Sequence, residues 1–135
     1  MTHLLDTSAL LAHYLAEDGA QRVQALFEDD AVEARASILS LFEFELRLHQ
    51  LDVNAATRAT ELSRYRALLN QVVDVTEAVR GEAIRLRTSA TAHVAAMDVL
   101  IAASASLGNA TLVHRDPHFS AIPANLLQQE VLPAK

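Results

Sequence analysis

The chain has 135 residues, of which 51% are hydrophobic, and its formal net charge at pH 7 is −6. This length suits one hydrophobic core, so we expect a single domain over residues 1–135. The absence of cysteine excludes disulfides, thiolate nucleophiles and cysteine-based zinc sites. The acidic balance argues against a protein that coats nucleic acid through bulk charge, but it allows a local site where arginine holds a phosphate.

Strands and helices alternate in the predicted order. In the first half we expect a strand, two helices, a strand and a helical pair, over residues 2–6, 9–16, 19–27, 32–38, 40–51 and 54–70. The second half predicts a strand, a helix, an alanine-rich helix and two strands, over residues 72–76, 76–87, 95–107, 110–116 and 128–133. Strands separated by helices favour an α/β fold, in which a mostly parallel five-stranded sheet is flanked by helices on both faces.

Neither end of this pattern indicates a membrane or a secretion signal. The N-terminus lacks a basic region followed by an apolar stretch, and no apolar run approaches the roughly 18 residues of a membrane span. We therefore expect a cytoplasmic protein that does not insert into a membrane.

Two aspartates follow apolar strand candidates. Asp6 and Asp116 thus fall at the carboxyl edge of the predicted sheet, where ligands of such folds bind. Asp98 lies in the first turn of the alanine-rich helix. Each aspartate also has a purely structural interpretation: Asp6 as a helix cap, Asp98 as a partner of the helix dipole, and Asp116 before Pro117 as a turn residue.

Two glutamates lie close together in the segment "SLFEFELRL". Glu43 and Glu45 are two positions apart, or about 200° around a helix, so at most one can face a given site. Pairing with Arg47 or His49, four residues further on, is the structural alternative for each. For Glu45 we favour such a surface pair.

The segments "LLDTSALLA", "SILSLFEFEL", "AMDVLIAASASLGNATLVHRD" and "PHF" together resemble the PIN-domain family, and most closely its VapC-type toxins from bacterial toxin–antitoxin pairs. The resemblance runs from Leu4 to Phe119 and implies a PIN-like three-layer fold. In the family pattern the four acids fall on Asp6, Glu43, Asp98 and Asp116. One departure is His114, which stands where the family commonly has a small hydroxyl residue.

The resemblance implies a metal-dependent endoribonuclease. Asp6 and Asp98 would be the main ligands of Mg²⁺ or Mn²⁺, and Glu43 and Asp116 would bind the metal directly or through water. This agrees with elementary electrostatics, because carboxylates held together repel unless hard divalent cations neutralise them. A metal-activated water would attack the phosphodiester and leave a 5′-phosphate and a 3′-hydroxyl.

Several neighbouring residues are candidates for supporting roles. Thr7, Ser8 and Ser40 could orient carboxylates or waters, although helix capping is the simpler role for the two serines. Arg115 could hold a phosphate or pair with an acid. Arg85 and Arg87 precede a polar stretch that is either an RNA-facing loop or an ordinary helix end.

As a VapC-like toxin, the protein would be a homodimer that cleaves RNA and is restrained by a small cognate antitoxin resembling VapB. Promoter DNA would be bound only through that complex. The alternatives are a stand-alone RNA-processing nuclease and a catalytically silent PIN-like binding module. A phosphoacceptor receiver domain would need a lysine near its last strands, and the only lysine is Lys135.

Overall fold

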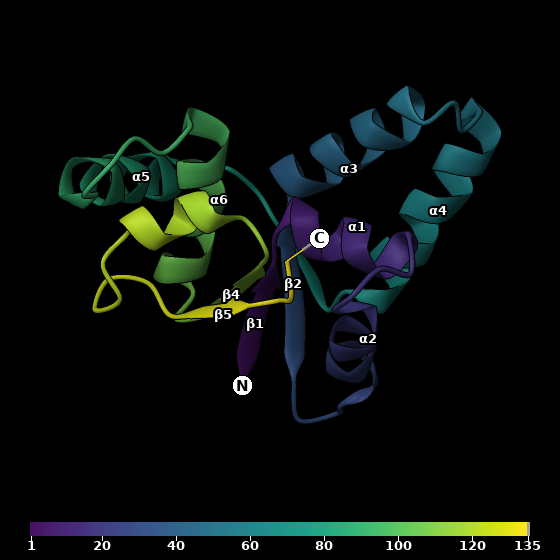
Figure 1. Cartoon of the computed structure of the whole chain (residues 1–135), viewed down its shortest axis with the longest axis horizontal. Helices are drawn as coiled ribbons and strands as arrows, with labels where there is room; N and C mark the ends of the chain where they lie inside the picture. The colour runs from purple at the N-terminus through teal and green to yellow at the C-terminus, as the bar shows by residue number, and fades with distance from the viewer. Residues whose placement is uncertain (135) are drawn as a thin grey trace.

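The centre of the structure is a five-stranded sheet with the strand order β3-β2-β1-β4-β5, as Figure 1 shows. The computed structural model describes residues 1–134, so Lys135, the last residue of the predicted domain, lies outside them. In chain order the elements are β1 (Thr2–Leu5), α1 (Thr7–Tyr14), α2 (Ala20–Glu28), β2 (Glu33–Ser37), α3 (Ile38–Gln50), α4 (Ala55–Leu68), β3 (Gln71–Val73), α5 (Glu77–Ser89), α6 (Ala96–Leu107), β4 (Thr111–His114), the 3₁₀ helix η1 (Pro117–Ala121) and β5 (Gln129–Val131).

All four strand pairings are parallel. The predicted α/β fold is therefore confirmed, and the sheet is wholly rather than mostly parallel. Parallel neighbours need a crossover, which helix pairs supply between β1 and β2, between β2 and β3, and between β3 and β4. Because the strands share one direction, their carboxyl ends meet at one edge of the sheet.

Hydrophobic side chains cover both faces of the sheet. Consecutive residues of a strand point to opposite faces, so Leu4 packs into one cluster with α5 and α6 while Leu5 packs into another with α1–α4. Leu112 and Val113 of β4 divide in the same way. In Figure 1, α5 and α6 accordingly lie on one side of the strands and α1–α4 on the other. Within residues 1–134, every helix is too short or too polar to traverse a bilayer.

Two helices begin earlier than predicted because other residues cap them. Helix α1 begins at Thr7, since the side chain of Asp6 rather than Ser8 accepts the capping hydrogen bond. Helix α3 begins at Ile38, since Ser37 rather than Ser40 is its cap. Ser8 and Ser40 therefore lie inside helices, and the simple capping role expected for them is wrong.

The short helix η1 was not predicted. Pro117 occupies its first position, and Asp116 is its N-cap, with the side chain accepting a hydrogen bond from the backbone N–H of His118. A 3₁₀ helix of five residues has no periodicity that a sequence pattern could reveal. Its effect is to turn the chain sharply just past the carboxyl end of β4.

The two-sided core gives a stability prediction. Leu112→Ala should lower the free energy of unfolding by about 2–5 kcal/mol, because Leu112 is fully buried and the smaller side chain leaves a cavity. Leu107, at the end of α6, is 47% exposed, so Leu107→Ala should change the same quantity by only about 0.5 kcal/mol. Urea denaturation of both variants measures the difference. Equal losses would contradict this description of the core.

Candidate active site

The first acidic side chain follows β1 directly. Asp6 is only 4% exposed. Its backbone N–H donates to the carbonyl of Val113 at 3.0 Å, which fixes Asp6 against β4. Its Oδ2 accepts hydrogen bonds from the Ser8 hydroxyl at 2.7 Å and the Ser8 backbone N–H at 3.3 Å. The capping role is therefore present, and it leaves the carboxylate buried at the carboxyl edge of the sheet.

Glu43 reaches this carboxylate from α3. The hydroxyl of Thr7, next to Asp6, donates to Glu43 Oε1 at 2.7 Å. Glu45 lies on another face of α3, where it is 3.5 Å from Arg58 and 44% exposed at its side chain. Of the two glutamates, Glu43 is thus the one beside Asp6, while Glu45 makes a surface pair with a different partner from the predicted His49.

Asp98 joins the group from the N-terminal turn of α6. Its pKa is raised to about 6, first by burial and then by the negative charges of Asp6, Asp116 and Glu43. Burial, with Glu43 as a smaller contributor, also raises the pKa of Asp6 to about 6, against the hydrogen bonds from Ser8. The other three predicted acids therefore lie near enough to Asp98 to repel its charge. The helix-dipole role is compatible with this, because α6 has no side-chain cap at Ala95.

Asp116 closes the group from the turn after β4. Its Oδ1 accepts the N–H of His118 at 2.9 Å, and the Nδ1 of the same histidine also lies 2.9 Å away. Its side chain remains 29% exposed. The turn role expected for an aspartate before proline is therefore present, and the carboxylate also repels the charge of Asp98.

The predicted supporting residues occupy different positions. Ser8 bridges two strand ends, because its hydroxyl donates to Asp6 and accepts the backbone N–H of Arg115 at 3.1 Å. Ser40 lies one turn before Glu43 on α3, and its buried hydroxyl has no hydrogen-bond partner among residues 1–134. The structure therefore gives Ser40 no hydrogen bond to the four acids among the described residues.

The side chain of Arg115 is largely buried, unlike that of an arginine that is open to bind a phosphate. Its side chain is 8% exposed and forms an ion pair with Glu17. The pair engages Nη2 of the guanidinium. The arginine therefore anchors the start of the turn that carries Asp116.

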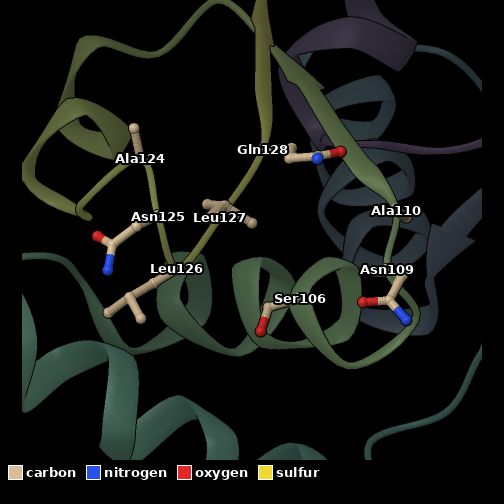
Figure 2. Close-up of a pocket in the computed structure, with 8 residues that line it drawn as sticks. All are labelled: Ser106, Asn109, Ala110, Ala124, Asn125, Leu126, Leu127 and Gln128. Carbon is tan, nitrogen blue, oxygen red and sulfur yellow. The ribbon is translucent and has the colours of Figure 1, made fainter.

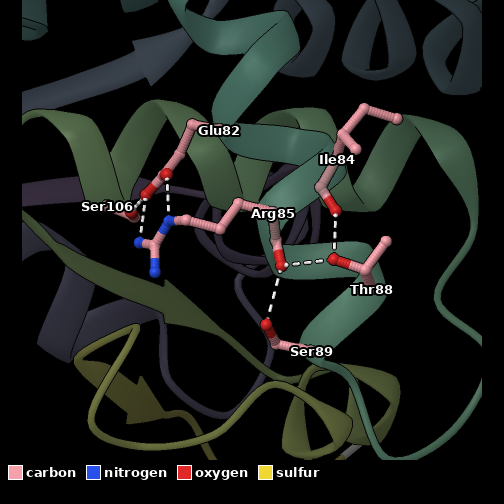
Figure 3. Close-up of polar contacts among 6 residues, drawn as sticks. All are labelled: Glu82, Ile84, Arg85, Thr88, Ser89 and Ser106. Carbon is pink, nitrogen blue, oxygen red and sulfur yellow. Dashed lines mark hydrogen bonds and ion pairs between the residues drawn. The ribbon is translucent and has the colours of Figure 1, made fainter.

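The helix behind Asp98 is braced by polar contacts. Figure 3 shows Arg85 paired with Glu82, at 2.6 Å between Nε and Oε1, and Glu82 accepting a hydrogen bond from Ser106 of α6. Thr88 donates back to the carbonyl of Ile84 at 3.0 Å, as is usual in a helix interior. Arg85 thus belongs to an α5–α6 contact, which favours the helix-end interpretation over an RNA-facing loop.

A polar cavity beside α6 lies apart from the four acids. A cavity of about 330 Å³ is lined by Ser106, Asn109 and the segment Ala124–Gln128, as Figure 2 shows. These residues precede β4 and β5, so the cavity opens at the amino edge of the sheet, opposite the carboxylates. It holds no acidic side chain and is not part of the candidate active site.

The donor set fits a hard divalent cation. Its members are carboxylate and hydroxyl oxygens, which Mg²⁺ and Mn²⁺ prefer, and the raised pKa values of Asp6 and Asp98 mark negative charge that a cation would neutralise. Within residues 1–134, however, no three acidic or histidine side chains are close enough together to coordinate one metal ion as they stand. The carboxylates interact through their charges without forming a complete cage, as suits a site that keeps waters on its metal.

The family model of the PIN domain matches residues 3–125. The chain belongs to the PIN-domain family. Solved structures with a similar fold include VapBC2 from Rickettsia felis bound to a promoter DNA fragment, with a TM-score of 0.78, 21% identity, and coverage of 98% of this chain and 100% of that one. No curated protein matches the sequence.

Two further PIN structures cover nearly the whole chain. FitAcB from Neisseria gonorrhoeae has a TM-score of 0.69 and 24% identity, and the match covers 96% of this chain and 97% of that one. VapC20 from Mycobacterium tuberculosis, a toxin that cleaves the sarcin-ricin loop, has a TM-score of 0.70 and 20% identity, with coverage of 98% and 100%. At these identities the likeness establishes the fold.

Asp98→Asn should stabilise the protein in metal-free buffer at neutral pH. Folded Asp98 has a pKa of about 6 against an ordinary value of 3.8, so between these values the folded chain binds the proton more tightly than the unfolded chain. Wild-type stability therefore falls as pH rises through this window. Removing the charge should raise the free energy of unfolding by on the order of 1.5 kcal/mol, a value already reduced for solvent screening. The lost interaction with the helix dipole should offset about 0.3–1 kcal/mol of this gain.

Urea denaturation in EDTA near pH 7.5 and pH 4.5 measures this effect. The variant should be the more stable protein at the higher pH, and its advantage should shrink at the lower pH, where wild-type Asp98 is largely protonated. A variant that is less stable than the wild type at pH 7.5 would make Asp98 a helix-terminus residue without repelling neighbours.

Proposed function

We propose that this PIN-domain protein is a Mg²⁺- or Mn²⁺-dependent endoribonuclease that acts as the toxin of a type II toxin–antitoxin pair. The observation that carries the proposal is the meeting of four carboxylates, Asp6, Glu43, Asp98 and Asp116, at the carboxyl edge of the sheet. An uncompensated acidic group of this kind suits binding of hard cations and hydrolysis of a phosphodiester.

Each acid has a role in this proposal. Asp6 and Asp98 would hold the cation, and Glu43 and Asp116 would hold it directly or through water. A bound cation would supply activation of the attacking water and stabilisation of the leaving oxygen. Thr7 orients Glu43 and Ser8 orients Asp6 through the hydrogen bonds described above. The expected products are a 5′-phosphate and a 3′-hydroxyl.

The choice of RNA and of a toxin role is supported by the relatives. VapC20 is a toxin that cleaves the sarcin-ricin loop, and the Rickettsia structure is VapBC2 bound to a fragment of promoter DNA. A cytoplasmic homodimer that binds promoter DNA only with its antitoxin completes the proposal. A stand-alone RNA-processing nuclease would use the same site without the antitoxin, whereas a silent binding module would not need four intact acids.

Asp6→Asn should abolish RNA cleavage and growth inhibition, because it removes one charge and one anionic ligand at nearly constant volume. Glu43→Gln should also lose most of its activity, whereas Glu45→Gln, on the exposed face of α3, should retain it. Cleavage of total RNA by the purified proteins with Mg²⁺ or Mn²⁺, followed by mapping of the ends, is the measurement. Cleavage at the wild-type rate by Asp6→Asn would contradict the assignment. If Glu45→Gln loses activity and Glu43→Gln keeps it, the active-site glutamate is Glu45 and not Glu43.

The antitoxin prediction concerns the surface formed by α1–α4. Phe42 and Leu46 on α3 are 56% and 43% exposed and line a groove of about 180 Å³ with His49 and Arg58. An amphipathic segment of a small partner could lay its apolar face there. Phe42→Asp should weaken binding of the product of the adjacent small gene, whereas Leu107→Asp, on the opposite side of the sheet, should not.

Isothermal titration with the purified partner and rescue of growth by co-expression test this prediction. If no adjacent gene product binds the wild-type protein or protects cells, the stand-alone nuclease becomes the better proposal.

A further inference from the structure

A chain of hydrogen bonds connects the edge strand β5 to Asp116. The side-chain amide of Gln129 donates to the carbonyl of Phe119 at 3.1 Å, and its oxygen lies 2.8 Å from His114 Nε2. The other ring nitrogen of His114, Nδ1, accepts the backbone N–H of Asp116 at 3.1 Å. The imidazole is 1% exposed and packs on the ring of Phe119, with 4.7 Å between centroids.

The donor and the acceptor of each of these hydrogen bonds can be assigned. A backbone N–H can only donate, so Nδ1 of His114 must be unprotonated and Nε2 must carry the proton. Nε2 then donates to Gln129, whose oxygen faces His114 because its NH₂ group is engaged by Phe119. Gln129 therefore selects the tautomer of His114 that can accept from Asp116.

The bond between the Asp116 N–H and His114 Nδ1 replaces a backbone hydrogen bond that the sheet does not provide. The last backbone hydrogen bonds of β4 are made by the carbonyls of Val113, to Asp6, and of His114, to Leu132. Beyond them, the N–H groups of Arg115 and Asp116 have left the strand, and buried backbone donors need partners. Ser8 accepts the first and His114 accepts the second. The two peptide N–H groups that precede the Asp116 side chain are therefore both fixed by hydrogen bonds.

We infer that His114 is a positioning residue for the reaction, which fixes the backbone of Asp116 through Nδ1, and that Gln129 holds it in the required tautomer. The inference rests on the proposed function of Asp116. It adds the edge strand β5 to the parts of the fold on which catalysis depends, although neither His114 nor Gln129 contacts the reacting atoms.

Two substitutions of His114 separate acceptance by Nδ1 from general packing. Asn carries an amide oxygen near the place of Nδ1 and can still accept from Asp116, whereas Gln extends toward Gln129 and leaves that N–H without a partner. His114→Gln should lower kcat about 10- to 100-fold with little change in KM, and His114→Asn should restore most of the loss. The substrate is a short synthetic RNA that contains the mapped cleavage site.

A second pair of variants tests whether Gln129 controls the tautomer of His114. Gln129→Leu removes the acceptor of Nε2–H and should lower kcat in the same way as His114→Gln. The matched control is Gln128→Leu, since Gln128 is exposed and its side chain accepts only a 3.5 Å bond from Thr111. This pair decides the question if substitution of the buried histidine prevents folding.

Hydrogen exchange of the Asp116 amide gives a readout that is independent of cleavage. It should be slow in the wild type, His114→Asn and Gln128→Leu, and fast in His114→Gln and Gln129→Leu, with the ring ¹⁵N signals of wild-type His114 showing the Nε2–H tautomer. If the wild type does not cleave RNA, the proposed function fails, and these signals still test the hydrogen-bond chain. If it cleaves and Gln129→Leu matches Gln128→Leu in kcat and in exchange, the inference is overturned.

Discussion

Repulsion among four carboxylates is the interaction around which this PIN domain is organised. A parallel sheet brings the ends of β1 and β4 to one edge, and α3 and α6 add their acids to the same place. Burial raises the pKa values of Asp6 and Asp98 to about 6, and the neighbouring carboxylates add to the rise. Placing these groups together does not stabilise the fold, and this clustering is what supports the proposed function.

The charges are held in place by neutral groups. Thr7 donates to Glu43, Ser8 donates to Asp6, and the N–H of His118 donates to Asp116. These donors orient the carboxylates, and those of Ser8 also oppose the rise in the pKa of Asp6. The same hydroxyl of Ser8 also accepts from Arg115, so the ends of β1 and β4 are linked through one side chain. Orientation and charge are therefore supplied by different residues.

Much of the fold could be predicted from the sequence, because alternating apolar strands and helices define a parallel sheet. Asp6 and Asp116 could be located by the same logic, since they follow strands. Glu43 could not be separated from Glu45 by periodicity, and the family resemblance was needed. Capping by Ser8 was wrong because "DTS" offers three candidates in a row, of which Asp6 is the cap. The contact of His114 with Gln129 was missed because it spans 15 positions between strands. The catalytic assignment itself stays a prediction.

The most direct test of the central claim is a titration of the ¹⁵N-labelled wild-type protein with Mn²⁺, whose paramagnetism broadens the amide signals of nearby residues. The account predicts that substoichiometric Mn²⁺ first broadens the amides of Asp6, Glu43, Asp98 and Asp116 and their neighbours, although these residues lie far apart in sequence. The acidic stretch Glu28–Asp30 at the C-terminal end of α2 is an internal control, since it carries three carboxylates outside the site. Broadening that begins at Glu28–Asp30, or that reaches all acidic residues together, would contradict the claim that the four carboxylates form one cation-binding site.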